Sequence, residues 1–131
     1  MSGVEIVVDI GIPEPVYEQI VRQIHDGVER GRLLPGAPLP TVRQLADDLA
    51  VNRNTVARAY KLLEDQGIIQ TAGRKGTFVR RDASREVVNV KTAEAQRALQ
   101  RLVHRVASSG LSRNQISTMF EQAVRYHRAK G

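Results

Sequence analysis

The feature that most limits the fold of this chain is a pair of capped helical segments separated by only three residues. Thr41 and Gln44 have the spacing of a capping box, in which each side chain satisfies a backbone N–H of the other residue. A tight break at 50–52 follows, and its Asn52 is a favoured N-cap for a second helix over 53–66. Apolar residues recur on that helix at the spacing of one helical face: Val56, Ala59, Tyr60 and Leu63. This part of the chain is therefore predicted to be two short helices joined by a tight turn.

A basic hairpin follows the two helices. Short β-prone runs at 68–70 and 77–79 flank a glycine-bounded turn that contains Arg74 and Lys75. This order of elements, two helices joined by a tight turn and then a basic hairpin, is typical of a winged helix-turn-helix. The second helix of that fold enters the major groove of DNA. The predicted fold class is α+β, with a winged helix-turn-helix DNA-binding domain over 1–81 and a two-helix C-terminal dimerisation hairpin.

The flanking segments complete the predicted organisation. Residues 5–10 are short and β-branched and lie between glycines, so they are predicted to form a strand. The proline- and glycine-rich stretch 33–40 is predicted to be an ordered loop, and the charged stretch 82–91 a linker. Between the strand and the loop, spacing four predicts an amphipathic helix of about four turns, with the stripe Val16, Ile20, Ile24 and Val28.

Two amphipathic helices are predicted within 92–131, the first capped by Thr92 and ending at Gly110, the second opened by a capping box at Ser112. A monomer of this size cannot cover both apolar stripes, and at about 25 cal/mol per Å² their exposure would cost several kcal/mol. We therefore expect a homodimer. The expected dimerisation residues are Leu99, Leu102, Val103, Val106, Ile116, Met119, Phe120, Ala123 and Val124.

The charge distribution favours a polyanionic partner. The net charge is +6, yet the first 52 residues carry 4 basic and 8 acidic side chains, whereas 53–81 carry 7 and 2, and 82–131 carry 9 and 4. Clustered cations bind a polyanion by releasing its counterions, so double-stranded DNA is the expected partner. The chain has no cysteine and no apolar run of membrane-spanning length. We expect a cytoplasmic protein with no cofactor and no membrane partner.

The polar front of the second helix is the predicted reader of DNA. Arg53 can pair with guanine, Asn54 with adenine, and Thr55 can offer a hydroxyl and a methyl group. A helix N-terminus also favours phosphate. The expected DNA-binding residues are Thr41, Arg43, Asn52, Arg53, Asn54, Thr55, Arg58, Arg74, Lys75 and Gly76. Simpler roles stay open for Asn52, as a helix cap alone, and for Arg58, as a phosphate contact or a solvated charge.

Several separate motifs lie within the first 80 residues: PVYEQI at 15–20, Gly36 with LPTVRQLA at 39–46, VNRNTV at 51–56, Gln66 with Gly67, and GTFV at 76–79. Together they closely resemble the GntR family of bacterial transcription regulators. Where that family usually has Leu-Pro-Ser-x-Arg, Thr41 replaces the serine and keeps the hydroxyl. The resemblance implies DNA contacts at Thr41, Arg43, Arg53, Asn54, Thr55 and Gly76, with Asn54 setting the sequence preference.

The resemblance also implies binding as a dimer to an inverted-repeat operator. A tail of two helices is similar to the YtrA-like subfamily, which is often associated with the control of transporter operons. The expected function is therefore a sequence-specific transcription regulator, most simply a repressor. Modulation by an unidentified small-molecule effector is left open, with Met119, Phe120, Tyr126 and His127 as pocket candidates, although such a stripe is more often core.

Other classes fit the sequence less well. His25, His104 and His127 are scattered, without metal-ligand spacing or an acid–base pair, so no catalytic or metal-binding residue is expected. An architectural DNA protein would be basic throughout, unlike the first 52 residues. A winged helix used for protein contacts stays open. So do three roles for Arg97, Arg101 and Arg105, which repeat at spacing four: a solvated face, a longer DNA footprint or an anionic effector site.

Overall fold

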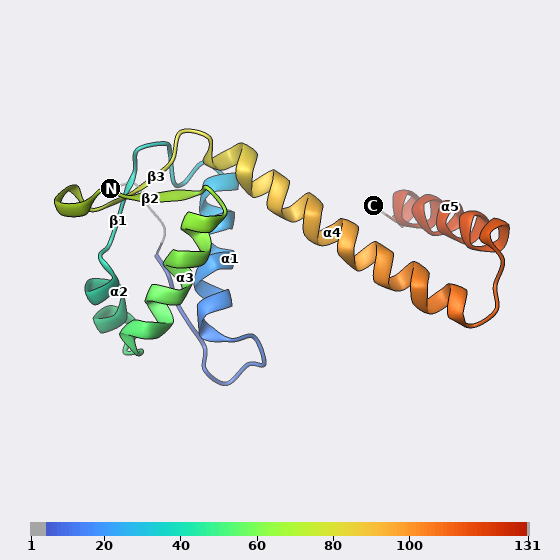
Figure 1. The fold of residues 1–131 in the computed structure, drawn as a ribbon, viewed down its shortest axis with the longest axis horizontal. Coiled ribbons are helices and arrows are strands. Elements are labelled where there is room, and N and C mark those ends of the chain that lie inside the picture. Colours follow the sequence, from blue (N-terminus) through green and yellow to red (C-terminus); the bar gives the residue numbers. More distant parts are fainter. Residues whose placement is uncertain (1–4, 131) are drawn as a thin grey trace. The chain divides into compact units, whose positions relative to one another are not determined.

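The computed structural model describes residues 5–130 and the side chains of residues 5–128. Its contacts divide the chain into two compact units, the N-terminal unit (1–90) and the C-terminal unit (91–131). The elements (Figure 1) are α1 (Val16–Glu29), β1 (Pro38–Leu39), α2 (Val42–Leu49), α3 (Arg53–Asp65), β2 (Ile69–Thr71), the 3-10 helix η1 (Gly73–Lys75), β3 (Thr77–Val79), α4 (Ala83–Ser108) and α5 (Arg113–Lys130).

Helices α1 and α3 pack side by side and form the core of the N-terminal unit (Figure 1). The apolar stripes predicted from residue spacing meet there, and Ile20, Ile24, Val56 and Leu63 are completely buried. Burial of one such side chain contributes about 1.5–3 kcal/mol. Helix α2 packs against α3 and adds Leu45 to the same core. The structure thus confirms the predicted helix-turn-helix.

The sheet has three short antiparallel strands in the order β1–β3–β2. Strands β2 and β3 form the predicted hairpin, with Thr71 opposite Thr77. Strand β1 lies on the other side of β3, although its sequence predicts only an ordered loop. Because Pro38 has no N–H to donate, it can pair only at a sheet edge, and β1 is such an edge strand.

The N-terminal segment corrects one prediction. Residues 5–10 are predicted to form a strand, but they join no sheet. Glutamine side chains of α1 bind the backbone of Val7 and Asp9 instead. The Gln23 amide accepts from the Val7 N–H at 3.0 Å and donates to the Val7 carbonyl at 2.6 Å, and Gln19 does the same for Asp9 at 2.9 and 2.8 Å. Residues four apart on a helix are about 6 Å apart, close to two residues of extended chain, so the two spacings match.

Helix α4 begins earlier than the sequence predicts. The stretch 82–91 is predicted to be a linker with Thr92 as a cap, whereas α4 runs without a break from Ala83 to Ser108. Ala83 and Val87 are buried in the core of the N-terminal unit, and this burial stabilises the first turns of the helix. These two side chains, one turn apart among exposed charged residues, are too weak an apolar pattern to predict a helix.

The C-terminal unit consists of the rest of α4 and of α5. The predicted capping box is present, because the Gln115 N–H donates to Ser112 Oγ at 3.2 Å and the Ser112 N–H donates to Gln115 Oε1 at 2.8 Å. None of the side chains described in 91–128 is buried. The apolar stripes are exposed by 41% to 49% at Leu102, Val103, Met119, Phe120 and Val124. Within 5–130, no helix combines the length and apolar character that crossing a membrane requires.

Candidate nucleic-acid interface

Helix α2 begins with the predicted capping box. Thr41 Oγ1 accepts a hydrogen bond from the Gln44 N–H at 3.0 Å, and Gln44 Oε1 accepts one from the Thr41 N–H at 2.9 Å. Such a cap stabilises a helix by about 1 kcal/mol. Because the hydroxyl acts here as an acceptor, its proton is left to donate to a phosphate oxygen. Arg43 is exposed on the first turn, so both predicted residues lie at the accessible start of α2.

The turn between α2 and α3 depends on a residue in the left-handed conformation. Ala50 has φ 56° and ψ 44°, and its N–H donates to the carbonyls of Ala46 and Asp47. A non-glycine residue in this conformation costs about 1 kcal/mol or more. The packing of Leu49 and Val51 against the core on either side offsets this cost. The short break predicted from sequence is thus held by burial of its neighbours.

The N-terminus of α3 presents polar side chains to solvent. Asn52 Oδ1 accepts from the Asn54 N–H at 2.7 Å, which confirms the predicted N-cap. Arg53 and Asn54 are exposed and Thr55 is half-buried, whereas the next residue, Val56, is fully buried. The side chains predicted to read DNA are therefore at the surface, at the end of the helix where backbone N–H groups favour phosphate.

The cations farther along α3 have partners within the chain. The Arg58 guanidinium stacks on the ring of Tyr17 in α1, 3.9 Å from its centroid, and Lys61 Nζ lies 3.1 Å from Asp65 Oδ1. The exposed ion pair contributes well under about 1 kcal/mol. A guanidinium stacked by its face keeps its N–H groups directed outwards in its own plane, which leaves them for phosphate. The sequence did not predict this contact of Tyr17, because no local pattern reveals which residue of α1 lies beside Arg58.

The hairpin of β2 and β3 is the wing, and η1 forms its tip, which carries the exposed Arg74 and Lys75. The Ala72 N–H donates to the Gly76 carbonyl at 2.8 Å and closes this turn. Gly76 has φ +93°, and no atom lies within 4 Å of a Cβ placed on it. Its backbone conformation, and not a lack of space, therefore requires glycine.

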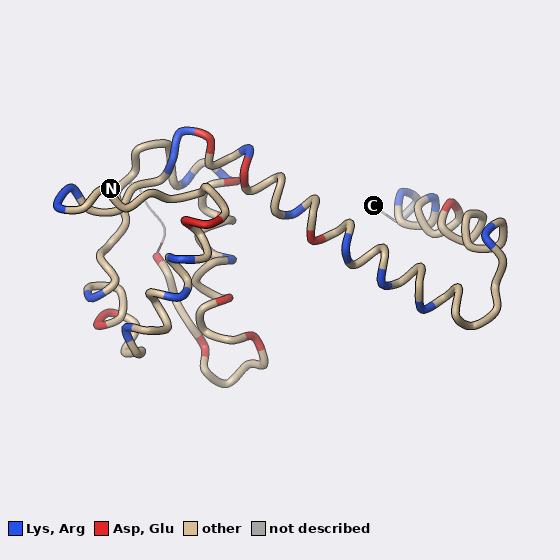
Figure 2. Tube along the Cα trace, in the orientation of Figure 1, with Lys and Arg blue, Asp and Glu red and all other residues tan. Residues whose placement is uncertain are grey.

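The three predicted elements meet at one surface. A groove of about 380 Å³ lies between the start of α2, the later turns of α3 and the wing. Of the predicted DNA-binding residues, Thr41 and Gly76 line it, together with Lys61 and Glu64, whereas Arg53, Asn54 and Thr55 do not. Figure 2 shows Lys and Arg in α2, in α3 and in the turn between β2 and β3. Tyr60 supports this arrangement, because its hydroxyl donates to the Pro40 carbonyl at 2.6 Å and ties α3 to the start of α2. Burial raises the pKa of Tyr60, so the phenol stays neutral.

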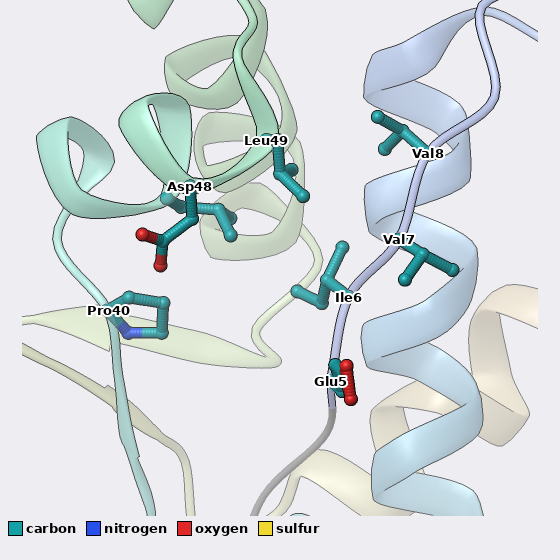
Figure 3. A pocket seen from close by; sticks show the side chains of 8 residues that line it. Glu5, Ile6, Val7, Val8, Pro40, Asp48 and Leu49 are labelled. Carbon is teal, nitrogen blue, oxygen red and sulfur yellow. The ribbon is translucent and has the colours of Figure 1, made fainter.

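A separate cavity of about 510 Å³ lies between the extended N-terminal segment and α2 (Figure 3). Ile6 and Leu49 are among its apolar side chains, and Glu5 and Asp48 add two carboxylates. None of the predicted DNA-binding residues lines this cavity, so it is separate from the candidate nucleic-acid interface.

The C-terminal unit contains a cavity of about 390 Å³ that includes one residue of the pocket considered from sequence. Met119 lines it together with Leu111, Asn114, Gln115 and Thr118. Phe120, Tyr126 and His127 do not line this cavity. Among the described residues, no group of three or more His, Asp or Glu is placed to hold a metal ion.

The helix-turn-helix, the exposed front of α3 and the basic wing define a winged helix-turn-helix DNA-binding protein. Residues 16–79 match the family described as "Bacterial regulatory proteins, gntR family". The chain is 51% identical over 74 residues to the HTH-type transcriptional regulator Rv1152 of Mycobacterium tuberculosis, covering 56% of this chain and 61% of that regulator. It is 39% identical over 89 residues to the HTH-type transcriptional repressor YtrA of Bacillus subtilis, covering 68% of each chain. The chain therefore belongs to the GntR family.

Solved structures agree with this assignment. A transcriptional regulator from Oenococcus oeni superposes with a TM-score of 0.67 at 32% identity, over 89% of this chain and 97% of that one. YtrA from Sulfolobus acidocaldarius, a GntR-family transcription factor, superposes with a TM-score of 0.54 at 29% identity, over 91% of this chain and 96% of that one. The DNA-binding domain of AraR, solved with operator ORX1, superposes with a TM-score of 0.51 at 29% identity, over 60% of this chain and 99% of that domain. The chain is a GntR-family DNA-binding transcription regulator of the YtrA-like kind, not an enzyme.

Proposed function

We propose that this chain acts in the cytoplasm as a transcriptional repressor that binds an inverted-repeat operator as a homodimer. The observation that carries the proposal is the capped N-terminus of α3, where Arg53 and Asn54 are exposed. A major groove admits a helix presented in this way. Two relatives support the proposal: YtrA of Bacillus subtilis is named a repressor, and the AraR domain was solved on an operator.

The base-reading residues in this proposal are the three at the front of α3. Arg53 donates two hydrogen bonds to guanine, Asn54 pairs with adenine, and Thr55 offers its methyl group to thymine. Each good bidentate pair discriminates against the wrong base by about 1–3 kcal/mol. Asn52 remains the cap that orients them.

The remaining contacts in this proposal go to the DNA backbone and fix the register of the protein on the duplex. Thr41 and Arg43 contact phosphate from the start of α2, and Arg58 does so from its place on Tyr17. The wing contributes Arg74 and Lys75 from its exposed tip, and Gly76 allows its backbone to come close.

Dimerisation in this proposal uses the exposed apolar stripes of α4 and α5. Unlike the core of the N-terminal unit, these stripes are only partly covered by described residues of the same chain: Leu99, Val106 and Ile116 are half-buried and the larger side chains are exposed. A second copy would bury the rest. The residues involved are Leu99, Leu102, Val103, Val106, Ile116, Met119, Phe120, Ala123 and Val124. A two-fold dimer then matches the two half-sites of an inverted repeat, about 34–36 Å apart or a multiple of this distance.

A small-molecule effector is the regulatory part of this proposal. The cavity of about 510 Å³ beside α2 has the size of a small-molecule site (Figure 3). Pro40, one of the residues that line it, immediately precedes Thr41, so a bound molecule would act on the start of α2. A metabolite panel tested by thermal shift should give hits that also change operator affinity, whereas stabilisation without such a change would separate this cavity from regulation.

The test begins by selecting DNA fragments that the full-length protein enriches at physiological salt. An inverted repeat should emerge, and Arg53→Ala should weaken binding to it by about 1–3 kcal/mol while relaxing the preference at one base position. Arg32→Ala, which removes an exposed arginine outside the interface, is the matched control. Equal losses in the two variants, or no enriched sequence, would overturn the proposal.

A promoter carrying the selected repeat in front of a reporter gene tests the direction of control. Transcription should fall when the protein is added and stay unchanged with Arg53→Ala. A rise in transcription would identify an activator.

A further inference from the structure

The net charge of this chain lies in its C-terminal unit. Residues 1–90 have 12 Lys or Arg and 12 Asp or Glu, a net charge of 0, whereas residues 91–131 have 8 and 2, a net charge of +6. Figure 2 shows this excess of Lys and Arg along the later turns of α4 and along α5. A dimer formed through the C-terminal units brings two such charges together, and their repulsion opposes association unless a polyanion neutralises them.

Three of these cations form a regular row on α4. Arg97, Arg101 and Arg105 (the arginine row) are four residues apart, so they follow one face of the helix at intervals of about 6 Å. All three are exposed. Among the described residues none of the three side chains has an acidic or hydrogen-bonding partner, whereas Arg22, for example, is paired with Glu14. The row is therefore a set of uncompensated positive charges.

The arginine row lies on the opposite side of α4 from its apolar stripe. At about 100° per residue, Leu99, Val103 and Val106 lie about 100° or more around the helix from every arginine of the row, whereas Leu102 lies about 60° from Arg105. A dimer that buries the stripe therefore leaves Arg97 and Arg101 in solvent, with Arg105 at the border of the interface, so dimerisation does not explain the row. Arg97 and Arg101, with Gln100 and His104, line a shallow groove of about 420 Å³, which offers several N–H donors side by side.

We propose that the arginine row binds the phosphate backbone of DNA, as a second electrostatic contact beside that of the helix-turn-helix. Guanidinium groups bind phosphate with paired hydrogen bonds, and a row of three at equal intervals suits a linear polyanion better than a small anion. The choice of DNA rests on the proposed function, since a duplex held by the N-terminal unit is at high effective concentration for a second site on the same chain.

The test compares two variants that remove the same charge from the full-length protein. R97Q/R101Q/R105Q removes the arginine row, and R113Q/R125Q/R128Q removes three arginines of α5 outside it. Glutamine keeps the side-chain length and the helix propensity. Binding is measured from about 50 to about 200 mM salt on the selected operator duplex and on an unrelated duplex of equal length. Light scattering checks that each variant is still a dimer.

We expect the plot of log affinity against log salt to become less steep for the arginine-row variant. Each lost phosphate contact removes about 0.9 from the slope, so a dimer that loses three contacts per subunit loses up to about 5. The change should be equal on both duplexes, because phosphate contacts do not read sequence. The α5 variant should retain the slope of the native protein.

An unchanged slope, or the same change in both variants, would overturn the proposal. A row variant that becomes monomeric would also overturn it, by placing the arginines in the dimer interface. Loss of binding to phosphatidylglycerol vesicles without a change on DNA would assign the row to a lipid surface instead. If the native protein shows no preference for the operator duplex, the proposed function fails, while the slopes on the unrelated duplex still decide the role of the row.

Discussion

The two units of this chain are built from the same local parts and are held together differently. Each has amphipathic helices, and each opens a helix with a capping box, at Thr41 in one and Ser112 in the other. In the N-terminal unit, three helices and a sheet cover Ile24 and Leu63 completely. In the C-terminal unit none of the side chains described in 91–128 is buried. Good helix signals therefore do not make a core, which needs elements packed on several sides of each stripe.

The N-terminal unit has a buried core, and the described part of the C-terminal unit does not. The largest expected effect therefore comes from a mutation that creates a cavity in that core. Leu63→Ala should lower the free energy of unfolding by about 2–5 kcal/mol, because it removes a completely buried side chain. Val103→Ala, at a side chain that is 41% exposed, should lower the free energy of unfolding much less. It is measured on a Leu102→Asp background, in which the expected dimer interface no longer covers Val103. Urea unfolding gives both values. Equal costs would show that the C-terminal unit has a core of its own.

The next effect tests whether a second copy supplies the missing cover. Leu102→Asp or Phe120→Asp should weaken dimerisation at least about 100-fold, because a buried unpaired carboxylate is strongly unfavourable. Light scattering over a range of concentrations measures the association. Asn114→Asp introduces the same charge on α5, off the apolar stripe, and should leave the dimer intact. A native-like dimer from both stripe variants would remove these stripes from the interface.

The two capping boxes allow a direct comparison of the units, because each cap stabilises its helix by about 1 kcal/mol. Thr41→Ala should lower the global stability of the N-terminal unit by this amount, because α2 packs against α3. Thr41→Ser should restore it. Ser112→Ala should act locally, as faster hydrogen exchange in the first turn of α5. If its effect is also global, the two units unfold together.

The smallest effect is a pH dependence in the N-terminal unit. Hydrogen bonds from the Arg22 guanidinium lower the pKa of Glu14 from its ordinary value of 4.5. Because the folded-state pKa lies below the unfolded one, the pair stabilises the fold above pH 4.5, and this is lost as the pH falls through the lowered value. Arg22→Gln should be slightly less stable than the native protein at pH 7 and equally stable in acid. Urea unfolding with Arg32→Gln as control measures the difference, and one that persists in acid would have another cause.

Much of the candidate site could be predicted from the sequence because its signals are local. The Thr41–Gln44 box, the Asn52 cap and the stripe of α3 each involve residues within a few positions of one another. They place the exposed Arg53 at a helix N-terminus without any knowledge of the rest of the fold. The roles of the DNA-binding and dimerisation residues stay predictions.

The elements that the sequence misses depend on distant partners. Pro38 and Leu39 become a strand only because β3 lies beside them. Residues 5–9 run along α1 without joining a sheet because Gln19 and Gln23 bind the backbone of Asp9 and Val7. Helix α4 reaches back to Ala83 because the N-terminal core buries this residue. In each case propensity is weak, and tertiary contacts decide the conformation.

The sequence alone determined where helices start, which of their faces are apolar and how the charges divide along the chain. These properties depend on hydrogen bonds and periodicities that span one or two helical turns. Only the tertiary structure decided that Arg58 stacks on Tyr17 and that the Tyr60 hydroxyl donates to the Pro40 carbonyl. Such contacts join residues far apart along the chain, and their free energy exists only once the whole unit has packed.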